Sequence, residues 1–204
     1  ASRLHANAYA LDYRLDLFSN FTYALDTENG DQFEQFDDRR VYGGQLSWAR
    51  PLSLLGLANE LDVGVELRRD DIGTVGLYKT IARQRIETTR EDDVTQSSYS
   101  AYSSLKSHWS EHVRTEIGLR ADRFEFDVRS NVAANSGSAN DSIVSPKFSL
   151  ILGPWRETEF FFNVGKGFHS NDARGATIRV DPTDGVTPVD KVDPLVNALG
   201  ADIG

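Results

Sequence analysis

Hydrophobic and polar residues alternate with a period of two in three long segments of the chain, at residues 9–26, 61–68 and 113–122. In each segment one row of alternate positions carries no charged residue, whereas the row between them holds the charges, as Val65 beside Glu66 illustrates. Successive side chains of a β-strand point to opposite faces of its sheet. The pattern therefore predicts strands with one apolar face and one polar face.

Further segments show the same alternation less cleanly. They lie at residues 40–50, 96–109, 143–152 and 158–169, and the start of an eighth strand is predicted after Leu195. Pro146 lacks a backbone N–H, so we expect a bulge or a locally unpaired position in its strand. In the segment 158–169 both Lys166 and Phe168 fall on the apolar row.

The connections between these strands alternate in length. Shorter turns are predicted after residue 50, near Ser110 and at residues 153–156. The long connections are predicted at residues 26–39, 71–94, 129–142 and 170–194. Long loops at one end and short turns at the other are typical of an outer-membrane β-barrel, in which the long loops lie outside the cell.

A soluble all-β domain is the alternative, because it also alternates apolar and polar residues. Three features favour the membrane barrel. The first strand runs for about 17 residues, beyond the usual range in globular sheets. Aromatic residues gather toward strand ends, and two connections are near or above 20 residues. We therefore predict an all-β, antiparallel transmembrane β-barrel whose apolar rows, including Leu11, Val65 and Ile117, face lipid and whose charged rows face the lumen.

Composition narrows the chemistry. The 204 residues carry a net charge of −9, so there is no basic footprint for a nucleic-acid partner. The absence of Cys excludes a disulfide framework, thiol catalysis and Cys-ligated metal sites. No run of 18 apolar residues predicts a transmembrane helix. The four His residues are scattered and the acidic segment 26–39 lacks the spacing of a calcium-binding loop, so no metal or cofactor is predicted.

One short motif holds candidate binding residues. His169, Ser170, Asn171 and Asp172 contain the residue types of a hydrolytic triad, but a triad is defined by geometry and not by adjacency in sequence. Gly, Asn and Asp here also suit the turn from a strand into a long loop. We expect a structural role and no catalysis. The candidates for ligand contact at the extracellular end are His169, Asn171, Asp172 and Arg174.

The segment 145–175, SPKFSLILGPWRETEFFFNVGKGFHSNDARG, resembles the barrel of TonB-dependent outer-membrane receptors. In that family a strand opening with Ser-Pro-Lys and a short turn precede an aromatic strand that closes on a signature like the one from Gly165 to Gly175. The resemblance extends less sharply over most of the chain, including DPLVNALGADIG at its end.

The resemblance implies a barrel of 22 strands, an N-terminal plug domain and a segment that engages TonB. Residues 1–204 are then expected to form a partial barrel domain of about seven or eight strands, cut at both ends, with the plug and the remaining strands absent. The implied location is the outer membrane of a Gram-negative bacterium, with lipid and lipopolysaccharide around the wall.

The implied function is active transport of a scarce large ligand. That ligand is most often a ferric siderophore, with cobalamin, haem and other chelates as alternatives, and uptake would be energised by the TonB complex through the plug. Two other classes stay open. One is a small self-contained outer-membrane channel or adhesin, and the other is a barrel enzyme such as a lipid hydrolase. We expect no enzymatic activity.

Overall fold

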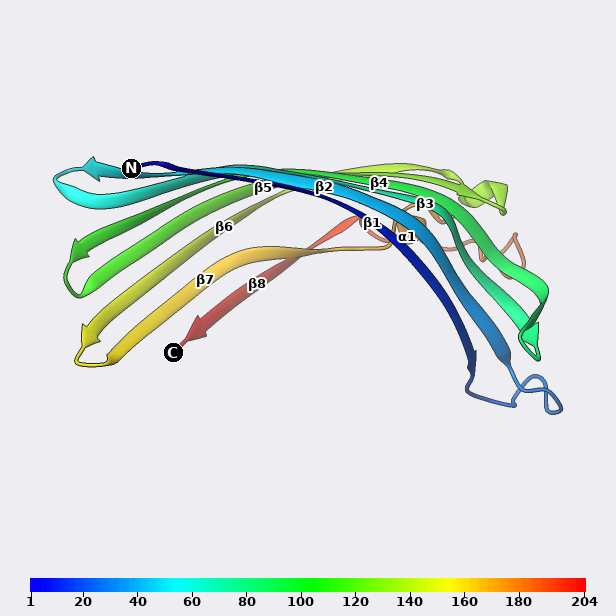
Figure 1. Cartoon of the computed structure of the whole chain (residues 1–204). Coiled ribbons are helices and arrows are strands. Elements are labelled where there is room, and N and C mark those ends of the chain that lie inside the picture. The colour runs from blue at the N-terminus through cyan, green and yellow to red at the C-terminus, as the bar shows by residue number, and fades with distance from the viewer.

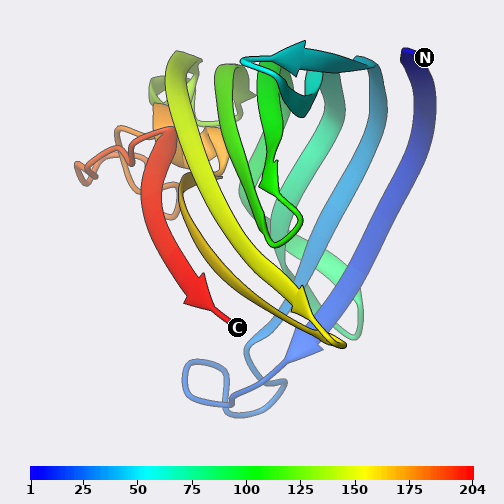
Figure 2. The same ribbon diagram turned by 90° about the vertical axis from the view of Figure 1, so that its left-hand side faces the viewer.

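Eight antiparallel strands follow one another in the same order along the chain and across one sheet, in a computed structural model that describes residues 1–204. The strands are β1 (Arg3–Asn20), β2 (Gln32–Leu54), β3 (Leu57–Ile81), β4 (Gln84–Ser110), β5 (Val113–Ser130), β6 (Gly137–Trp155), β7 (Thr158–Ser170) and β8 (Leu195–Ile203). Strands β1 and β8 lie at opposite edges of the sheet (Figure 2). The predicted eighth strand after Leu195 is confirmed.

The connections at one end of the sheet are all short, whereas three of the four at the other end are longer, in partial agreement with the prediction. Two-residue turns join β2 to β3, β4 to β5 and β6 to β7 at one end. The opposite end carries the connections 21–31, 82–83, 131–136 and 171–194. The connection 131–136 contains a 3-10 helix, η1 (Ala133–Asn135), and the connection 171–194 contains one turn of α-helix, α1 (Ala173–Thr177). Neither helix is long and apolar enough to cross a membrane.

The predicted long loop at residues 71–94 is wrong. There β3 continues to Ile81 and β4 begins at Gln84, so only Ala82 and Arg83 form the turn, both with positive φ. The register between β3 and β4 shifts three times in this stretch, and each shift places one extra residue in one of the two strands, once in β3 and twice in β4. The alternation of apolar and polar residues is therefore interrupted here, although the segment forms strands. Two other connections are also shorter than predicted, at 21–31 and 131–136, and β1 ends at Asn20 rather than at residue 25.

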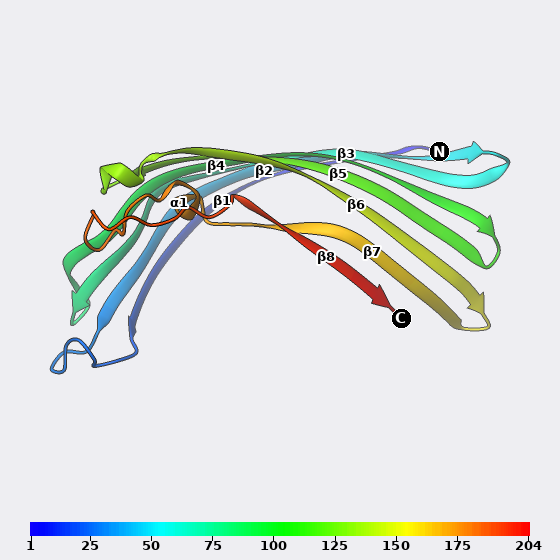
Figure 3. The same cartoon turned by 180° about the vertical axis from the view of Figure 1, so that it is seen from behind.

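The sheet is bowed, and α1 lies beneath its concave side (Figures 1 and 3). Ala173 of α1 packs there against Ile72, Val94, Phe126 and Val128, which form the buried apolar cluster of the structure. This cluster identifies the concave rows, because alternate residues of one strand and paired residues of neighbouring strands share a face.

The convex face carries a continuous apolar band. Its members are Leu4, Ala6, Ala8 and Ala10 on β1, Tyr42, Leu46 and Trp48 on β2, Val63, Val65 and Leu67 on β3, Tyr99, Ala101 and Leu105 on β4, Ile117, Leu119 and Ala121 on β5, Val144, Phe148, Leu150 and Leu152 on β6, and Phe160, Phe162 and Val164 on β7. Many of these side chains are large and exposed. The band is the surface that a lipid bilayer would cover, and the predicted facing of Val65 and Ile117 agrees with it.

The predicted facing of β1 is wrong. Leu11 pairs with Val41, which in turn pairs with Asp70 on the concave face, so the apolar row of β1 that contains Leu11 is also concave. Tyr9 belongs to that row and lies over Gly43, where a Cβ would come within 2.2 Å of the tyrosine ring. The residues of β1 that join the convex apolar band are the alternate positions from Leu4 to Ala10. Most of them precede the strongly alternating segment 9–26. Pairing with β2 fixes this choice, and the charged residue Asp12 is left on the convex side.

The pairing between β6 and β7 ends next to Pro146, as predicted for a residue that lacks a backbone N–H donor. Pro146 pairs in regular register with Leu119 of β5, so no bulge forms on that side. On the other side, β6 pairs with β7 only as far as Lys147 and Gly165. Beyond this point β7 leaves β6 and runs across the concave face (Figure 1).

Opposite faces of β2 provide a test of the membrane-facing surface. Leu46→Arg places a charge in the apolar band and should cost about 2–4 kcal/mol of unfolding free energy in a bilayer. Gln45→Arg is the matched control, because Gln45 lies next in sequence on the concave face opposite Glu66, and it should cost less than about 1 kcal/mol. Urea titration of the full-length protein in lipid vesicles measures both. Equal costs would contradict the assigned faces.

Candidate functional site

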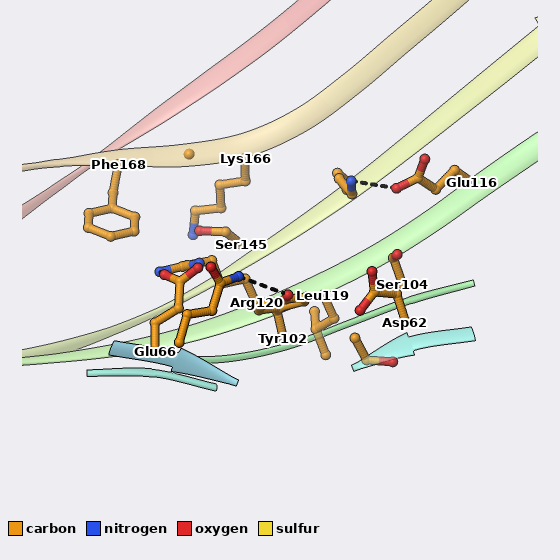
Figure 4. A pocket seen from close by; sticks show the side chains of 14 residues that line it. Asp62, Glu66, Tyr102, Ser104, Glu116, Leu119, Arg120, Ser145, Lys166 and Phe168 are labelled. Atoms are coloured by element: carbon orange, nitrogen blue, oxygen red, sulfur yellow. Dashed lines mark hydrogen bonds and ion pairs between the residues drawn. The ribbon is translucent and has the colours of Figure 1, made fainter. Parts of the chain in front are cut away.

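A polar cavity of about 630 Å³ lies on the concave face, between β7 and the wall formed by β2 to β6. Lys166 and Phe168 point into it from β7, towards Glu66 and Arg120 on the opposite side (Figure 4). The remaining lining residues are Gln45, Asp62, Tyr102, Ser103, Ser104, Glu116, Leu119, Ser145, Lys147 and Gly167. The cavity is therefore lined mainly by polar groups, with three acidic and three basic side chains.

Strand β7 creates this cavity because it separates from β6. Sequence alternation placed Lys166 and Phe168 on the apolar, lipid-facing row, and this prediction is wrong. Once β7 crosses the concave face, its formerly outward row faces the inner surface of the sheet. The Phe168 ring accordingly packs edge-on against Phe124, with the ring centroids 5.7 Å apart.

Ion pairs organise the wall of the cavity. Arg120 donates to Glu66 at 2.7 Å and to Asp122 at 2.9 Å, and Ser100 donates to the same Asp122 oxygen at 2.6 Å. On the next strands Lys147 donates to Glu116 at 2.6 Å. Charge-assisted hydrogen bonds of this kind are stronger than neutral ones and hold side chains in place.

Two buried polar atoms in this wall have no hydrogen-bond partner, namely Oδ1 of Asp62 and Oγ of Ser145. Both residues line the cavity. A buried polar atom without a partner is costly.

A second cavity of about 550 Å³ adjoins the first and leads along the concave face toward the long connections. Tyr9 and Arg68 lie on its border. Two layers further toward the loops, the guanidinium of Arg39 lies over the Tyr13 ring, 6.0 Å from its centre. Tyr9 and Tyr13 are each more than two-fifths exposed, so their rings are available to a ligand in the lumen.

The ion pairs continue from the cavity to α1. Arg68 donates two hydrogen bonds to Asp70, of 2.8 and 2.9 Å, and Arg39 pairs with both Asp70 and Asp37. Arg90 pairs with Asp92 at 2.5 Å. The Arg90 guanidinium also lies 3.5 Å from the backbone carbonyl of Arg174 in α1.

Three of the predicted ligand-contact residues hold the connection 171–194 in place. Asp172 caps α1 by accepting the backbone N–H of Arg174, and its carboxylate also binds the Arg174 guanidinium at 2.6 Å. Asn171 donates to the backbone carbonyl of Asp193 at 2.7 Å. His169 is exposed and pairs with Val196 of β8. Ligand contact by these four residues stays a prediction.

The charges around Asp172 favour its ionised form. Burial opposes ionisation, but hydrogen bonds and the charge of Arg174 outweigh it and keep the pKa of the Asp172 carboxyl below its usual range. Burial likewise lowers the pKa of Arg174, whereas Asp172, Asp92 and Asp37 raise it above its usual value. The pair therefore stays charged throughout the neutral and mildly acidic range.

Sequence reasoning missed Asn135, which is fully buried and joins two connections. Its side-chain oxygen accepts the backbone N–H groups of Arg179 and Val180, and its amide donates to the carbonyl of Val180. No local pattern marks such a contact between distant loops. The ion pairs of the concave face could have been predicted from the sequence. An arginine and a carboxylate two residues apart lie on the same face of a strand, as Arg68 and Asp70 do.

The connection 21–31 is ordered by Asp31. Its carboxylate accepts the backbone N–H groups of Ala24, Leu25 and Asp26 and the hydroxyl of Thr22. The Thr22 hydroxyl first, and then these backbone donors, lower the pKa of Asp31 to about 2. The acidity of this loop thus serves its own folding. No three His, Asp or Glu side chains of the chain converge as a metal site.

A family model described as TonB dependent receptor-like, beta-barrel matches residues 2–193, nearly the whole chain. The chain belongs to this family. Its location is therefore the bacterial outer membrane, and its family consists of receptors rather than enzymes. The convex apolar band is the surface that meets lipid, and the short turns mark the periplasmic end.

Comparison with solved structures supports the fold of this barrel section. The crystal structure of the ferric citrate transporter FecA in the unliganded form superposes with a TM-score of 0.69 and 11% sequence identity. The alignment covers 82% of this chain and 25% of the FecA chain, so the chain spans about a quarter of the length of that protein. A comparison with curated proteins gives no match.

Removing the positive charge of Arg174 tests whether its ion pair with Asp172 holds the connection 171–194 in place. Arg174→Ala leaves Asp172 without its partner and should cost about 1–2 kcal/mol of local stability. Amide exchange at Arg179 and Val180 in the full-length receptor should then accelerate about tenfold. Arg179→Ala is the control, because that side chain is exposed. Equal exchange rates in the two variants would show that the ion pair does not anchor the segment.

The low pKa of Asp31 predicts how the connection 21–31 responds to acid. Because the folded-state pKa lies below the ordinary value, the stabilisation is complete above about pH 4. It is lost as the pH falls through about 2. Amide protection of residues 24–26, corrected for intrinsic exchange, should follow this course. Asp31→Asn should abolish the protection at pH 7, whereas Glu28→Gln should not. Protection that survives Asp31→Asn would disprove the assigned role.

Proposed function

We propose that this chain is a section of the wall of an active-transport receptor that takes up a ferric siderophore and is energised through TonB. The carrying observation is the row of exposed tyrosines beside arginines on the concave face, formed by Tyr9, Tyr13, Arg39 and Arg68. Aromatic faces and guanidinium groups suit ferric chelates, which present aromatic or carboxylate oxygen donors around the metal.

The open sheet supports the proposal that residues 1–204 are a partial barrel domain. Strands β1 and β8 remain unpaired edges. Within a bilayer every backbone group needs a partner, so both edges require further strands. In the proposed receptor these strands close a barrel of about 22, and a plug domain fills its lumen and engages TonB. The concave polar face then borders the plug and the path of the ligand.

The predicted contact residues divide into two roles in this proposal. His169, which is exposed near the extracellular end of β7, contacts the ligand directly. Asn171, Asp172 and Arg174 hold the connection 171–194 against the wall and so position its outer part, residues 181–187, at the mouth of the barrel.

The alternative of a small self-contained channel or adhesin is less well supported. A closed barrel of eight strands requires β8 to pair with β1, whereas the two strands lie at opposite edges of this sheet (Figure 2). The similarity to FecA concerns the fold alone, and the ferric citrate named for that protein serves only as one probe.

Binding of ferric chelates to the full-length receptor tests the proposal. The probes are ferric citrate, a ferric catecholate and a ferric hydroxamate, with cobalamin and haem as the competing classes. One ferric chelate should bind, and Tyr9→Ala with Tyr13→Ala should weaken it about tenfold, which corresponds to about 1.4 kcal/mol. Tyr99→Ala is the matched control, because Tyr99 is similarly exposed but lies on the convex face.

Two outcomes would contradict different parts of the proposal. Binding of cobalamin or haem alone would overturn the ferric siderophore while leaving the transport class intact. Uptake that persists after dissipation of the energy source, with no saturable binding of any probe, would favour a passive channel.

A further inference from the structure

The pairing between β6 and β7 stops partway across the apolar band. Lys147 and Gly165 are the last paired residues, and beyond them β7 crosses the concave face (Figures 1 and 3). Val144, further along β6, lies level with Val65 in the middle of the band. Strand β6 therefore has an unpaired edge at the depth of the hydrocarbon. We call the opening between residues 142–146 of β6 and residues 166–170 of β7 the β6–β7 seam.

An unpaired strand edge is costly in a bilayer, because lipid supplies no hydrogen bonds to the backbone. Such an edge is tolerated only where it is buried in protein or lines a water-filled cavity. The polar cavity of about 630 Å³ lies at this edge, since Ser145 of β6 and Lys166, Gly167 and Phe168 of β7 all line it. The seam therefore lies between a polar cavity on the concave side and the apolar band on the convex side.

Two polar groups beside the seam are free to bind an anion. Arg120 and Lys147 form ion pairs within the cavity, whereas Lys166 forms none and points into the cavity from β7 (Figure 4). On β6, the buried Oγ of Ser145 has no hydrogen-bond partner. An ammonium group and a hydroxyl group can both donate to a carboxylate, and such charge-assisted hydrogen bonds are strong. Asp62, whose Oδ1 also lacks a partner, lies three strands away on β3.

We propose that the seam is a lateral portal through which an anionic single-chain amphiphile of the fatty-acid class enters the cavity from the outer leaflet. The carboxylate binds Lys166 and Ser145, and the acyl chain passes through the seam to the apolar band beside Val144. Burial of the chain against apolar side chains stabilises the complex. The inference rests on the outer-membrane location of the family and not on the proposed transport of a siderophore.

The shape of the seam favours one acyl chain over two. The seam lies on the extracellular side of the paired segment, so it opens toward the outer leaflet. At Lys147 and Gly165 the two strands return to the ordinary strand spacing of about 4.8 Å, so the opening narrows to a wedge. The cavity behind it, of about 630 Å³, has the volume of a small-molecule site and not of a diacyl lipid in its bilayer.

Photolabelling of the full-length receptor in lipid vesicles tests the site. The probe is palmitate with a diazirine in the first half of its chain, and unlabelled palmitate is the competitor. Labelling should concentrate on residues 142–146 and 164–168, and Lys166→Gln should lower it at least tenfold. Lys106→Gln is the matched control and should leave the labelling unchanged. Lys106 is an exposed lysine of the concave face that does not line the cavity.

A reversible disulfide tests the portal and guards against loss through misfolding, because residues 1–204 contain no Cys. Continuing the register of Lys147 and Gly165 would place Ser142 opposite Ser170. Ser142→Cys with Ser170→Cys should therefore oxidise slowly, since a disulfide needs a short distance between its residues. Once formed, the bond should close the seam and lower the labelling at least tenfold, and dithiothreitol should restore it.

The control for the disulfide is Ser149→Cys with Asn163→Cys, because these residues are directly paired in the closed part of the same two strands. This pair should oxidise readily and leave the labelling unchanged. The proposal is overturned if the seam pair oxidises as fast as the control pair, or if labelling persists after the seam is closed. It is also overturned if the unaltered receptor is not labelled at the seam, or if Lys166→Gln is labelled as strongly as Lys106→Gln.

Discussion

The whole sheet depends on one constraint: a strand in hydrocarbon has no water to satisfy its backbone, so its neighbours must supply every partner. Of 132 backbone hydrogen bonds, 115 lie within the regular helices and strands. Such a ladder leaves no freedom to shift a strand by one residue, because a shift exchanges its two faces. Which row of a strand meets lipid is therefore decided by its neighbours as well as by its own sequence.

This constraint explains where sequence alternation predicted the fold and where it failed. Strands β3 and β5 keep an unbroken period of two through the membrane, so Val65 and Ile117 were placed correctly. In β1 the strongest alternation lies beyond the apolar band, and the small residues that meet lipid, such as Ala8, carry little signal. The outer part of the hairpin of β3 and β4, at residues 71–94, was missed because its bulges interrupt the period.

The candidate site was predictable only where its partners are close in sequence. The cap of Asp172 on α1 follows from a local motif, and the sequence indicated it as a turn. The other carboxylates that act on Arg174, Asp92 and Asp37, lie on strands far away in the sequence. The hydrogen bond from the Asn135 side chain to the carbonyl of Val180 joins two distant loops. Contacts of this kind depend on register and curvature, which no single segment encodes.

The same arginine–carboxylate spacing serves different ends on the two faces. On the concave face the carboxylates of Asp70, Asp92 and Asp122 keep 5% or less of their surface exposed, so each needs its arginine and the pair is fixed. On the convex face both partners are exposed, and water can replace either one at little cost. Burial, rather than the motif itself, therefore separates a fixed ion pair of the lumen from a loose ion pair on the outer surface.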